Sequence, residues 1–317
     1  MKKTIDVHPE FGIELTLALP YAYWLHQNDK LNKVITSKDM KPFYYFCDNV
    51  EERYTERTVD NAAAGLNSLP NNWLHHNAWA NFGKDHDDLD KEQQRESNGF
   101  LDYSQWTPPP LEKIYKNDRF VFEKPIVIIN NSFNIEGGTM PTRYFSIECL
   151  YEMFTYLTEQ NYIVIYRRPK NKELPTIDQN EMNTIQNLGD IEDNVEGVGL
   201  LNDYQLTEYF EDVLLFDELL EKNKDLSYNE FQCMLYANCD KFISYVGGGG
   251  IISTYFGGTN IMWVSRGKEV RDGYLEENSY YRQYSDCNLI NVFDTEEKYP
   301  HKIENYKELL ETIRREF

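Results

Sequence analysis

Hydrophobic and polar positions follow two different patterns along the chain, and the change falls near residue 120. Residues 12–31, GIELTLALPYAYWLHQNDKL, have the spacing of a helix interrupted by a proline, and residues 41–47, KPFYYFC, form an apolar run that predicts a buried strand. The segment from about residue 60 to residue 120 is polar, and its WTPPP sequence excludes a helix or a central strand at that point. We therefore expect long loops and a connector there.

After residue 120, short apolar runs alternate with segments of helical spacing. This alternation predicts the α/β class, with a doubly wound parallel sheet covered by helices on both faces. We expect an N-terminal domain over residues 1–120, a parallel-sheet domain over 121–300 and a C-terminal helix over 301–317. The predicted strands are 124–131, 162–169, 241–246 and 260–265, and the predicted helices in this half are 146–160, 227–240 and 251–256.

Charge and cysteine content narrow the possible partners. The chain has 317 residues and a net charge of −21, from 53 acidic and 32 basic residues. Nucleic acid and anionic membranes bind basic surfaces, so we expect neither as the main partner. The five cysteines show no CxxC pair, which favours a reducing cytoplasm over a disulfide framework. No segment is long and apolar enough to cross a bilayer, and charged residues interrupt the N-terminal apolar run, which argues against a signal peptide.

Four consecutive glycines, Gly247–Gly250, stand between a predicted strand and a predicted helix. Ligands of open parallel sheets bind at such strand-to-helix turns, where a backbone without Cβ atoms permits close approach and N–H groups face an anion. We therefore expect the turn to bind a phosphate or diphosphate, although a tight turn or a packing contact also needs glycine. The GxGxxG fingerprint fails because its third position is Ile252, and no P-loop sequence is present.

The segment CDKFISYVGGGGIISTYFGGTNIMWV resembles the donor-binding segment of GT-B glycosyltransferases, and KPIVIINNSFNIEGG with the residues up to YIVIYRRP resembles the first βαβ unit of the same domain. The resemblance covers roughly residues 120–295. This part of the chain is similar to surface-glycan glycosyltransferases of bacteria and large viruses. It implies two Rossmann-like domains, the C-terminal one binding a nucleotide-sugar. It further implies a hexosyl- or pentosyltransferase with a glycan acceptor, located in the cytoplasm (the host cytoplasm for a viral protein), with no separate cofactor.

On this resemblance, the donor lies between the two domains and its diphosphate meets the glycine turn. Arg167 and Arg168 end the second predicted strand, and one of them could pair with phosphate. The alternative for these arginines is a solvated strand end with salt bridges. The implied donor-binding residues are Gly247, Gly248, Gly249, Gly250, Ile251 and Ile252 (through their N–H groups), Asn130, Asn131, Arg167 and Arg168.

Inverting sugar transfer requires a base that takes the proton of the acceptor hydroxyl, and in a GT-B arrangement this base comes from the N-terminal domain. We propose Glu14, because apolar neighbours would desolvate its carboxylate; the alternative is a Glu on the solvated face of the first helix. The other candidates are Asp48, His75 and His76.

Three other functions remain open. A metal-dependent GT-A enzyme would use a DxD motif, and Asp85 and Asp87 match it formally, but they lie in a charged run with no strand before it, so we expect no essential metal. A non-catalytic nucleotide- or carbohydrate-binding module would need the same glycine turn. A sugar-nucleotide epimerase or dehydrogenase is disfavoured, because the YxxxK pair and the third glycine are missing.

Overall fold

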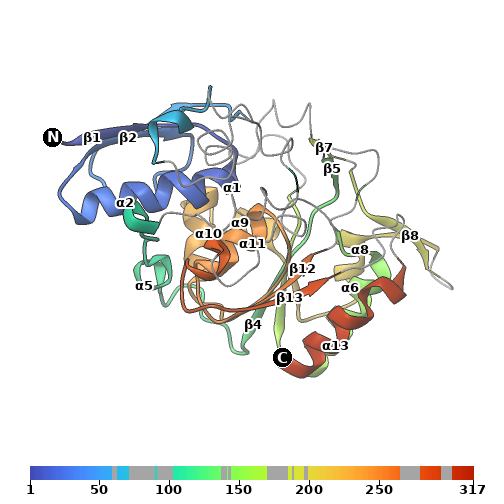
Figure 1. Cartoon of the computed structure of the whole chain (residues 1–317). Helices are drawn as coiled ribbons and strands as arrows, with labels where there is room; N and C mark the ends of the chain where they lie inside the picture. Colours follow the sequence, from blue (N-terminus) through green and yellow to red (C-terminus); the bar gives the residue numbers. More distant parts are fainter. Residues whose placement is uncertain are drawn as a thin grey trace.

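Figure 1 shows the computed structural model of the chain. The structure describes residues 1–58, 63–70, 90, 103–136, 141, 144–169, 185–187, 189–195, 199–264, 279–293 and 302–317. Two parallel sheets dominate these residues, a smaller one near the N-terminus and a larger one from the second half.

The smaller sheet contains three parallel strands in the order β1-β2-β3. The helical segment that joins β1 to β2 changes from π-helix to α-helix at Leu19, so Pro20 lies in the first turn of α2. The expected proline interruption corresponds to this change. The elements are β1 (Lys3–Asp6), α1 (Phe11–Ile13), the π-helix η1 (Glu14–Ala18), α2 (Leu19–Gln27), β2 (Leu31–Ser37) and β3 (Val50–Tyr54).

The apolar run 41–47 is not a strand, contrary to our expectation. Its backbone forms consecutive turns, in which Phe43 and Tyr44 are nevertheless fully buried. The run is apolar because it fills the core beneath the small sheet. Short buried runs of this kind do not distinguish a strand from other buried structure.

The larger sheet has six parallel strands in the order β10-β6-β4-β11-β12-β13. Numbered by their sequence within this sheet, the order is 3-2-1-4-5-6, which is that of a dinucleotide-binding sheet. The strand order reverses between β4 and β11, so these two neighbouring strands flank the position where such sheets bind ligands. The strands are β4 (Ile126–Asn130), β6 (Ile163–Arg167), β10 (Val213–Leu215), β11 (Lys241–Tyr245), β12 (Thr259–Val264) and β13 (Asn288–Phe293).

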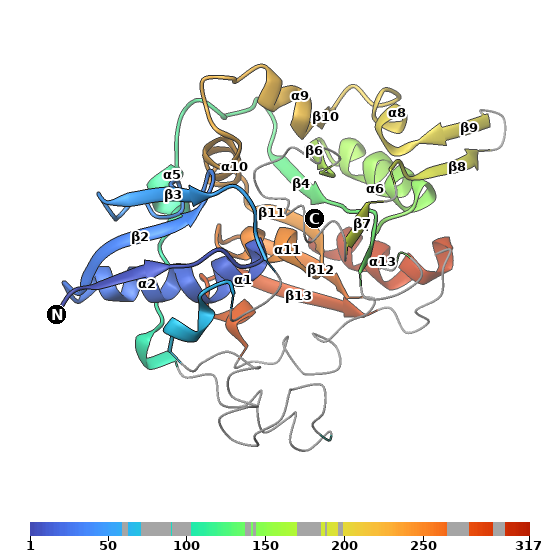
Figure 2. The same ribbon diagram turned by 90° about the horizontal axis from the view of Figure 1, so that it is seen from above.

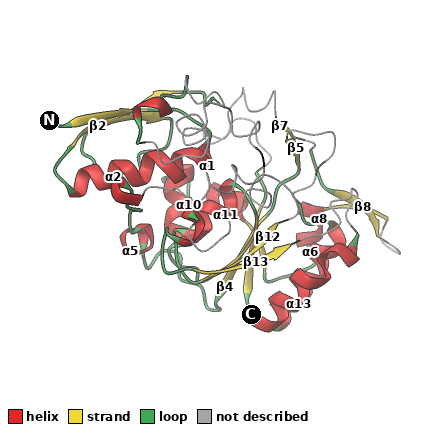
Figure 3. Cartoon of the chain, viewed as in Figure 1, coloured by secondary structure: helices red, strands yellow, loops and turns green. Residues whose placement is uncertain are grey.

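Helices cover both faces of the larger sheet (Figure 3). On one face, α6 (Ile147–Glu159) and α13 (Lys307–Glu316) pack against alternate residues of the strands, such as Val127 and Ile129. On the other face, α10 (Tyr228–Tyr236) and α11 (Gly248–Thr254) pack against Ile128 and the neighbouring strand residues that point to the same face. The hydrophobic cluster on this second face, beneath α10 and α11, also contains core residues of the N-terminal region. The two sheets therefore share one continuous core.

The remaining elements are short. They are η2 (Leu66–Ser68), η4 (Tyr103–Gln105), α5 (Leu111–Tyr115), β5 (Asn134–Glu136), β7 (Ile185–Asn187), β8 (Glu192–Val195), β9 (Gly199–Asn202), α8 (Asp203–Thr207), α9 (Phe216–Glu221), η5 (Tyr280–Arg282) and η6 (Ile303–Tyr306). The strand β9 pairs with β8 in a two-stranded antiparallel sheet and not with the larger sheet.

The predicted α/β fold with parallel sheets is confirmed, whereas the domain boundaries at residues 120 and 300 stay a prediction. The last helix, α13, packs against α6 and β12. Within the described residues, no helix is both long and apolar enough for a membrane span.

Candidate functional site

The candidate site lies where the carboxyl ends of the two sheets meet. In the larger sheet, β11 ends at Tyr245 and is followed by the glycine turn, Gly247–Gly250. In the smaller sheet, β1 leads into α1, and α1 contacts α11 directly, as Figures 1 and 2 show. The Cβ position of Gly12 on α1 is 3.7 Å from the Cα of Gly248. The first helix of the N-terminal region therefore begins against the start of α11.

The four glycines do not serve one purpose. Gly247 has a φ of +140°, which side chains rarely permit. A Cβ on Gly250 would lie 2.8 Å from the Met262 side chain and 2.9 Å from a backbone oxygen, and one on Gly249 would lie 3.3 Å from Asn130 Cβ. Backbone conformation or close packing therefore favours glycine at these three positions. Gly248 has ordinary helical geometry, and its Cβ position meets only Phe11, at 3.6 Å. Packing does not explain why this residue lacks a side chain.

Asn130 and Asn131 end the central strand β4 beside the glycine turn, as the sequence indicated. Asn130 donates to Ser253 of α11 at 3.0 Å, and its oxygen accepts hydrogen bonds from Tyr236 and Arg167. Asn131 bonds to Tyr166 and to the backbone of Phe145. Both side chains thus connect the strands to the covering segments. Their contact with a donor stays a prediction.

Arg167 and Arg168 also point into the protein. Arg167 donates to the Tyr228 hydroxyl and to Asn130. Arg168 forms a buried pair with Asp203, and it also donates to the Gly189 carbonyl and to Asp190. The alternative of a solvated strand end is wrong, because both arginines are buried, but Arg168 does form salt bridges, with Asp190 and Asp203. Neither guanidinium faces the glycine turn as a free cation, and their role in binding phosphate stays a prediction.

The predicted use of the Ile251 N–H group needs a correction. The helix α11 begins at Gly248, not after the glycines, and the Ile251 N–H group already donates to Gly247 O at 2.9 Å. The N–H groups without a partner inside the helix are those of its first turn, so they belong to the glycines rather than to Ile251 or Ile252.

Glu14 lies at the start of the π-helix and is fully buried. Its Oε1 accepts hydrogen bonds from the Thr36 hydroxyl and, at 3.0 Å, from the Tyr44 hydroxyl, and its Oε2 accepts from Arg57 Nη1 at 2.7 Å. The expected desolvation of the carboxylate is confirmed and the alternative of a solvated helix face is wrong, although the groups that contact the carboxylate directly are polar. The carboxylate lies in a buried polar group with one cation. Short π-helical segments frequently occur at functional sites.

Tyr44 completes this group as a hydrogen-bond donor. Burial, and next the Glu14 carboxylate beside it, raise the pKa of Tyr44 well above its ordinary value. Its hydroxyl therefore stays protonated at neutral pH and donates to the carboxylate. Thr36, Tyr44 and Arg57 were missed in the sequence, because nothing in their local pattern connects them with Glu14.

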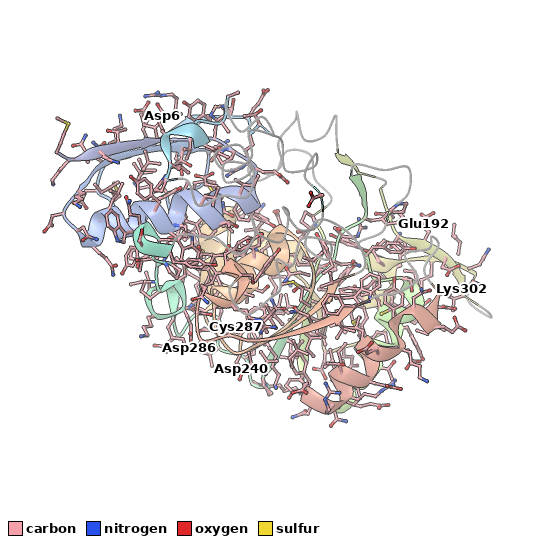
Figure 4. All side chains as sticks on the ribbon, in the orientation of Figure 1. Asp6, Glu192, Asp240, Asp286, Cys287 and Lys302 are labelled. Atoms are coloured by element: carbon pink, nitrogen blue, oxygen red, sulfur yellow. The ribbon has the colours of Figure 1, made fainter. Side chains whose placement is uncertain are left out.

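The other candidate residues fall outside this group. Asp48 is exposed on the loop before β3, and His75, His76, Asp85 and Asp87 lie outside the described residues. No cluster of metal-ligating side chains occurs among the residues that the structure describes. Asp240 and Asp286, labelled in Figure 4, precede β11 and β13 and so lie at the amino ends of the strands, opposite the glycine turn.

Two surface pockets also lie away from this site. One, of about 570 Å³, lies between β13 and α13, and the other, of about 310 Å³ and lined mainly by apolar side chains, lies between α6, α8 and β9.

Comparison with known proteins identifies the fold. No family model matches the chain, and no curated protein sequence is significantly similar. The structure is similar to that of Escherichia coli heptosyltransferase WaaC with ADP, with a TM-score of 0.55, 11% identity and coverage of 98% of this chain and 99% of that one. E. coli ADP-heptose lipopolysaccharide heptosyltransferase II matches with a TM-score of 0.48 and 12% identity, over 99% and 100% of the two chains. A family 9 glycosyl transferase from Veillonella parvula matches with a TM-score of 0.44 and 8% identity, over 99% and 89%.

The likeness to WaaC extends over nearly the whole of both chains, and at 11% identity it describes the fold. The resemblance to GT-B glycosyltransferases is thereby confirmed at the level of architecture.

Proposed function

We propose that this chain is a glycosyltransferase that transfers a sugar from a nucleotide-sugar to a glycan acceptor. The observation that carries the proposal is the position of the glycine turn. The turn follows β11 at the reversal of strand order, and the first helix of the other sheet contacts it. In a doubly wound sheet this is the position of a nucleotide ligand. The fold supports the same function, because the similar WaaC structure contains ADP.

In this proposal, Gly248 and the first backbone N–H groups of α11 face the diphosphate, and Glu14 is the base. Glu14 comes from the N-terminal region. It lies two residues after Gly12, whose Cβ position is close to Gly248. The carboxylate takes the proton of the acceptor hydroxyl as its oxygen attacks the anomeric carbon, while the bond from this carbon to the diphosphate breaks. The protonated Glu14 then loses its proton to solvent, and the nucleoside diphosphate leaves.

The direct test is a thermal-shift panel of UDP-, GDP-, CMP-, dTDP- and ADP-sugars, with ADP-heptose included because WaaC is a heptosyltransferase. A ligand at 100 times its dissociation constant adds about 2.7 kcal/mol to stability. Any donor that stabilises the protein is then tested for slow hydrolysis without acceptor. Binding with hydrolysis supports a transferase of the proposed hexosyl or pentosyl type, or a heptosyltransferase. Binding alone, with no turnover for any acceptor, identifies a non-catalytic binding module.

Gly248→Asp should abolish donor binding without unfolding the protein. The new side chain has space beside Phe11, but its negative charge lies where the diphosphate approaches. Gly248→Ala is the matched control, because it adds only the Cβ atom. Calorimetry measures the affinity of the donor found by the panel. An unchanged affinity in folded Gly248→Asp protein would exclude the glycine turn as the diphosphate site.

The reaction is proposed to need no metal and no separate cofactor, since the backbone N–H groups at the start of α11 provide the positive potential for the leaving diphosphate. Donor hydrolysis should therefore persist in EDTA. Loss of activity in EDTA that manganese restores would favour the DxD residues Asp85 and Asp87 instead.

A further inference from the structure

Arg57 is a buried cation whose hydrogen bonds are incomplete. The residue follows β3 and is only 1% exposed. Its Nη1 donates to the Pro9 carbonyl and to Glu14 Oε2, both at 2.7 Å. Its Nε and Nη2 are buried and have no hydrogen-bond partner in the part of the chain that the structure describes. Three N–H bonds of the guanidinium, one on Nε and two on Nη2, therefore have no acceptor.

One edge of the guanidinium has the geometry of an oxyanion site. Nε and Nη2 lie along the same edge of the planar guanidinium, each with one N–H bond directed outward from that edge, and this pair of donors matches two oxygens of a carboxylate or a phosphate. Buried polar groups in native proteins nearly always have partners, and an unsatisfied donor on a charged group is especially unfavourable. A partner from outside the chain accounts for the retention of this arrangement.

The position of Arg57 indicates which partner. Its guanidinium carbon lies 5.5 Å from the centre of the Phe11 ring, and the same ring lies 3.6 Å from the Cβ position of Gly248. Arg57 is thus separated by a single side chain from the one glycine of the turn that the fold does not explain. The arginine comes from the N-terminal region and the glycine from the larger sheet, so this position lies between the two regions.

We propose that Nε and Nη2 of Arg57 bind a phosphate-type oxyanion, and that this anion is the diphosphate of the donor. The source rests on the function proposed above. Arg57 then has two tasks: Nη1 holds the Glu14 carboxylate, and the opposite edge holds the leaving group. Because one guanidinium contacts both, base and donor are fixed relative to each other when the diphosphate binds.

The test measures binding of inorganic pyrophosphate to the full chain by calorimetry. Arg57→Lys keeps a cation that pairs with Glu14 but removes the Nε and Nη2 edge. We expect pyrophosphate affinity to fall at least tenfold in this variant, with little change in the unfolding temperature. Arg53→Lys is the matched control, because Arg53 lies on β3 with its side chain 45% exposed; its affinity should equal that of the wild type.

Competition then identifies the source of the anion. If a nucleoside diphosphate displaces pyrophosphate from the wild type, and Arg57→Lys weakens both ligands, the anion is that of the donor. If Arg57 is needed for pyrophosphate but the nucleoside diphosphate neither competes nor depends on it, the oxyanion belongs to the acceptor. That result overturns the donor assignment while the oxyanion site stands.

Pyrophosphate affinity that is equal in the wild type and folded Arg57→Lys would overturn the proposal, as would a wild type that binds no pyrophosphate; a buried water is then the partner. Donor hydrolysis by the same wild-type protein would leave the proposed function intact. If Arg57→Lys does not fold, Arg57→Gln combined with Glu14→Gln removes both charges and is compared with Glu14→Gln alone.

Discussion

Two buried arginine–carboxylate pairs of this protein are built alike but completed differently. Arg168 follows β6 and pairs with Asp203, the first residue of α8, and Arg57 follows β3 and pairs with Glu14, the first residue of the π-helix. In each pair both side chains are almost completely buried. Each carboxylate also accepts a hydrogen bond from a buried tyrosine, Tyr166 for Asp203 and Tyr44 for Glu14.

The difference lies in the rest of the guanidinium. Arg168 also donates to Asp190 and to the Gly189 carbonyl, so its hydrogen bonding is accounted for by the fold. Arg57 donates only through Nη1 within the described residues. A satisfied buried pair needs no ligand, whereas an incomplete one beside the glycine turn suggests a site for one. The comparison thus separates a cluster that specifies structure from a cluster suited to chemistry.

The largest expected effect concerns the satisfied pair. Asp203→Ala leaves the Arg168 charge buried without its main partner, which costs roughly 3–5 kcal/mol of stability. Urea denaturation measures this loss. Asp225→Ala is the control, because Asp225 and its partner Arg119 are exposed, and such pairs contribute at most about 1 kcal/mol. If Asp203→Ala cost no more than Asp225→Ala, the structural role of the Arg168 pair would be disproved.

The incomplete pair should respond in activity. Glu14→Gln keeps an oxygen that accepts from Arg57, but the amide cannot take a proton. We expect kcat to fall roughly 100-fold, which corresponds to about 2.7 kcal/mol in activation free energy. Donor affinity should change little. Asp48→Asn should leave kcat unchanged, since Asp48 is exposed and lies outside this cluster. Normal turnover of Glu14→Gln would remove Glu14 as the base.

Much of the larger sheet was predictable because its signals are local. The strands β4, β6, β11 and β12 are continuous apolar runs, as expected of parallel strands buried on both faces, and α6 begins at a Ser146 cap. The strands β10 and β13 were missed, because one has only three residues and the other contains the polar residues Asn288 and Asn291.

The candidate site could be predicted only in part. Its glycine turn is visible in the sequence, but which of the four glycines is free of packing depends on Asn130 and Met262, which are distant in the sequence. The pairing of Arg57 with Glu14 joins residues 43 positions apart, and that of Arg168 with Asp203 joins residues 35 apart. No periodicity links such residues. Consequently the sequence suggested Glu14 from apolar neighbours, whereas the fold surrounds it with polar ones.

The two tyrosines offer the test with the smallest expected effect. Tyr44→Phe and Tyr166→Phe each remove one hydrogen bond to a buried carboxylate, which costs about 1.5 kcal/mol at pH 7; Tyr166→Phe also removes the acceptor of a hydrogen bond from Asn131. Burial, followed by the adjacent carboxylate, raises the pKa of both tyrosines well above the ordinary value of about 10. Below pH 10 both hydroxyls are protonated in the folded and unfolded chains, so the cost of each substitution should be constant there.

Above pH 10 the unfolded chain releases the tyrosine proton, but the folded chain retains it. The stability that each tyrosine contributes is therefore fully present below pH 10 and is lost as the pH rises toward the folded-state pKa, by about 1.4 kcal/mol per pH unit. Urea denaturation between pH 8 and pH 11 should show the free energy of unfolding of the wild type converging with that of each variant. Only Tyr44→Phe should also lower kcat at pH 7, because Tyr44 contacts the proposed base. Equal loss of kcat in Tyr166→Phe would show that the two clusters do not divide structure from chemistry.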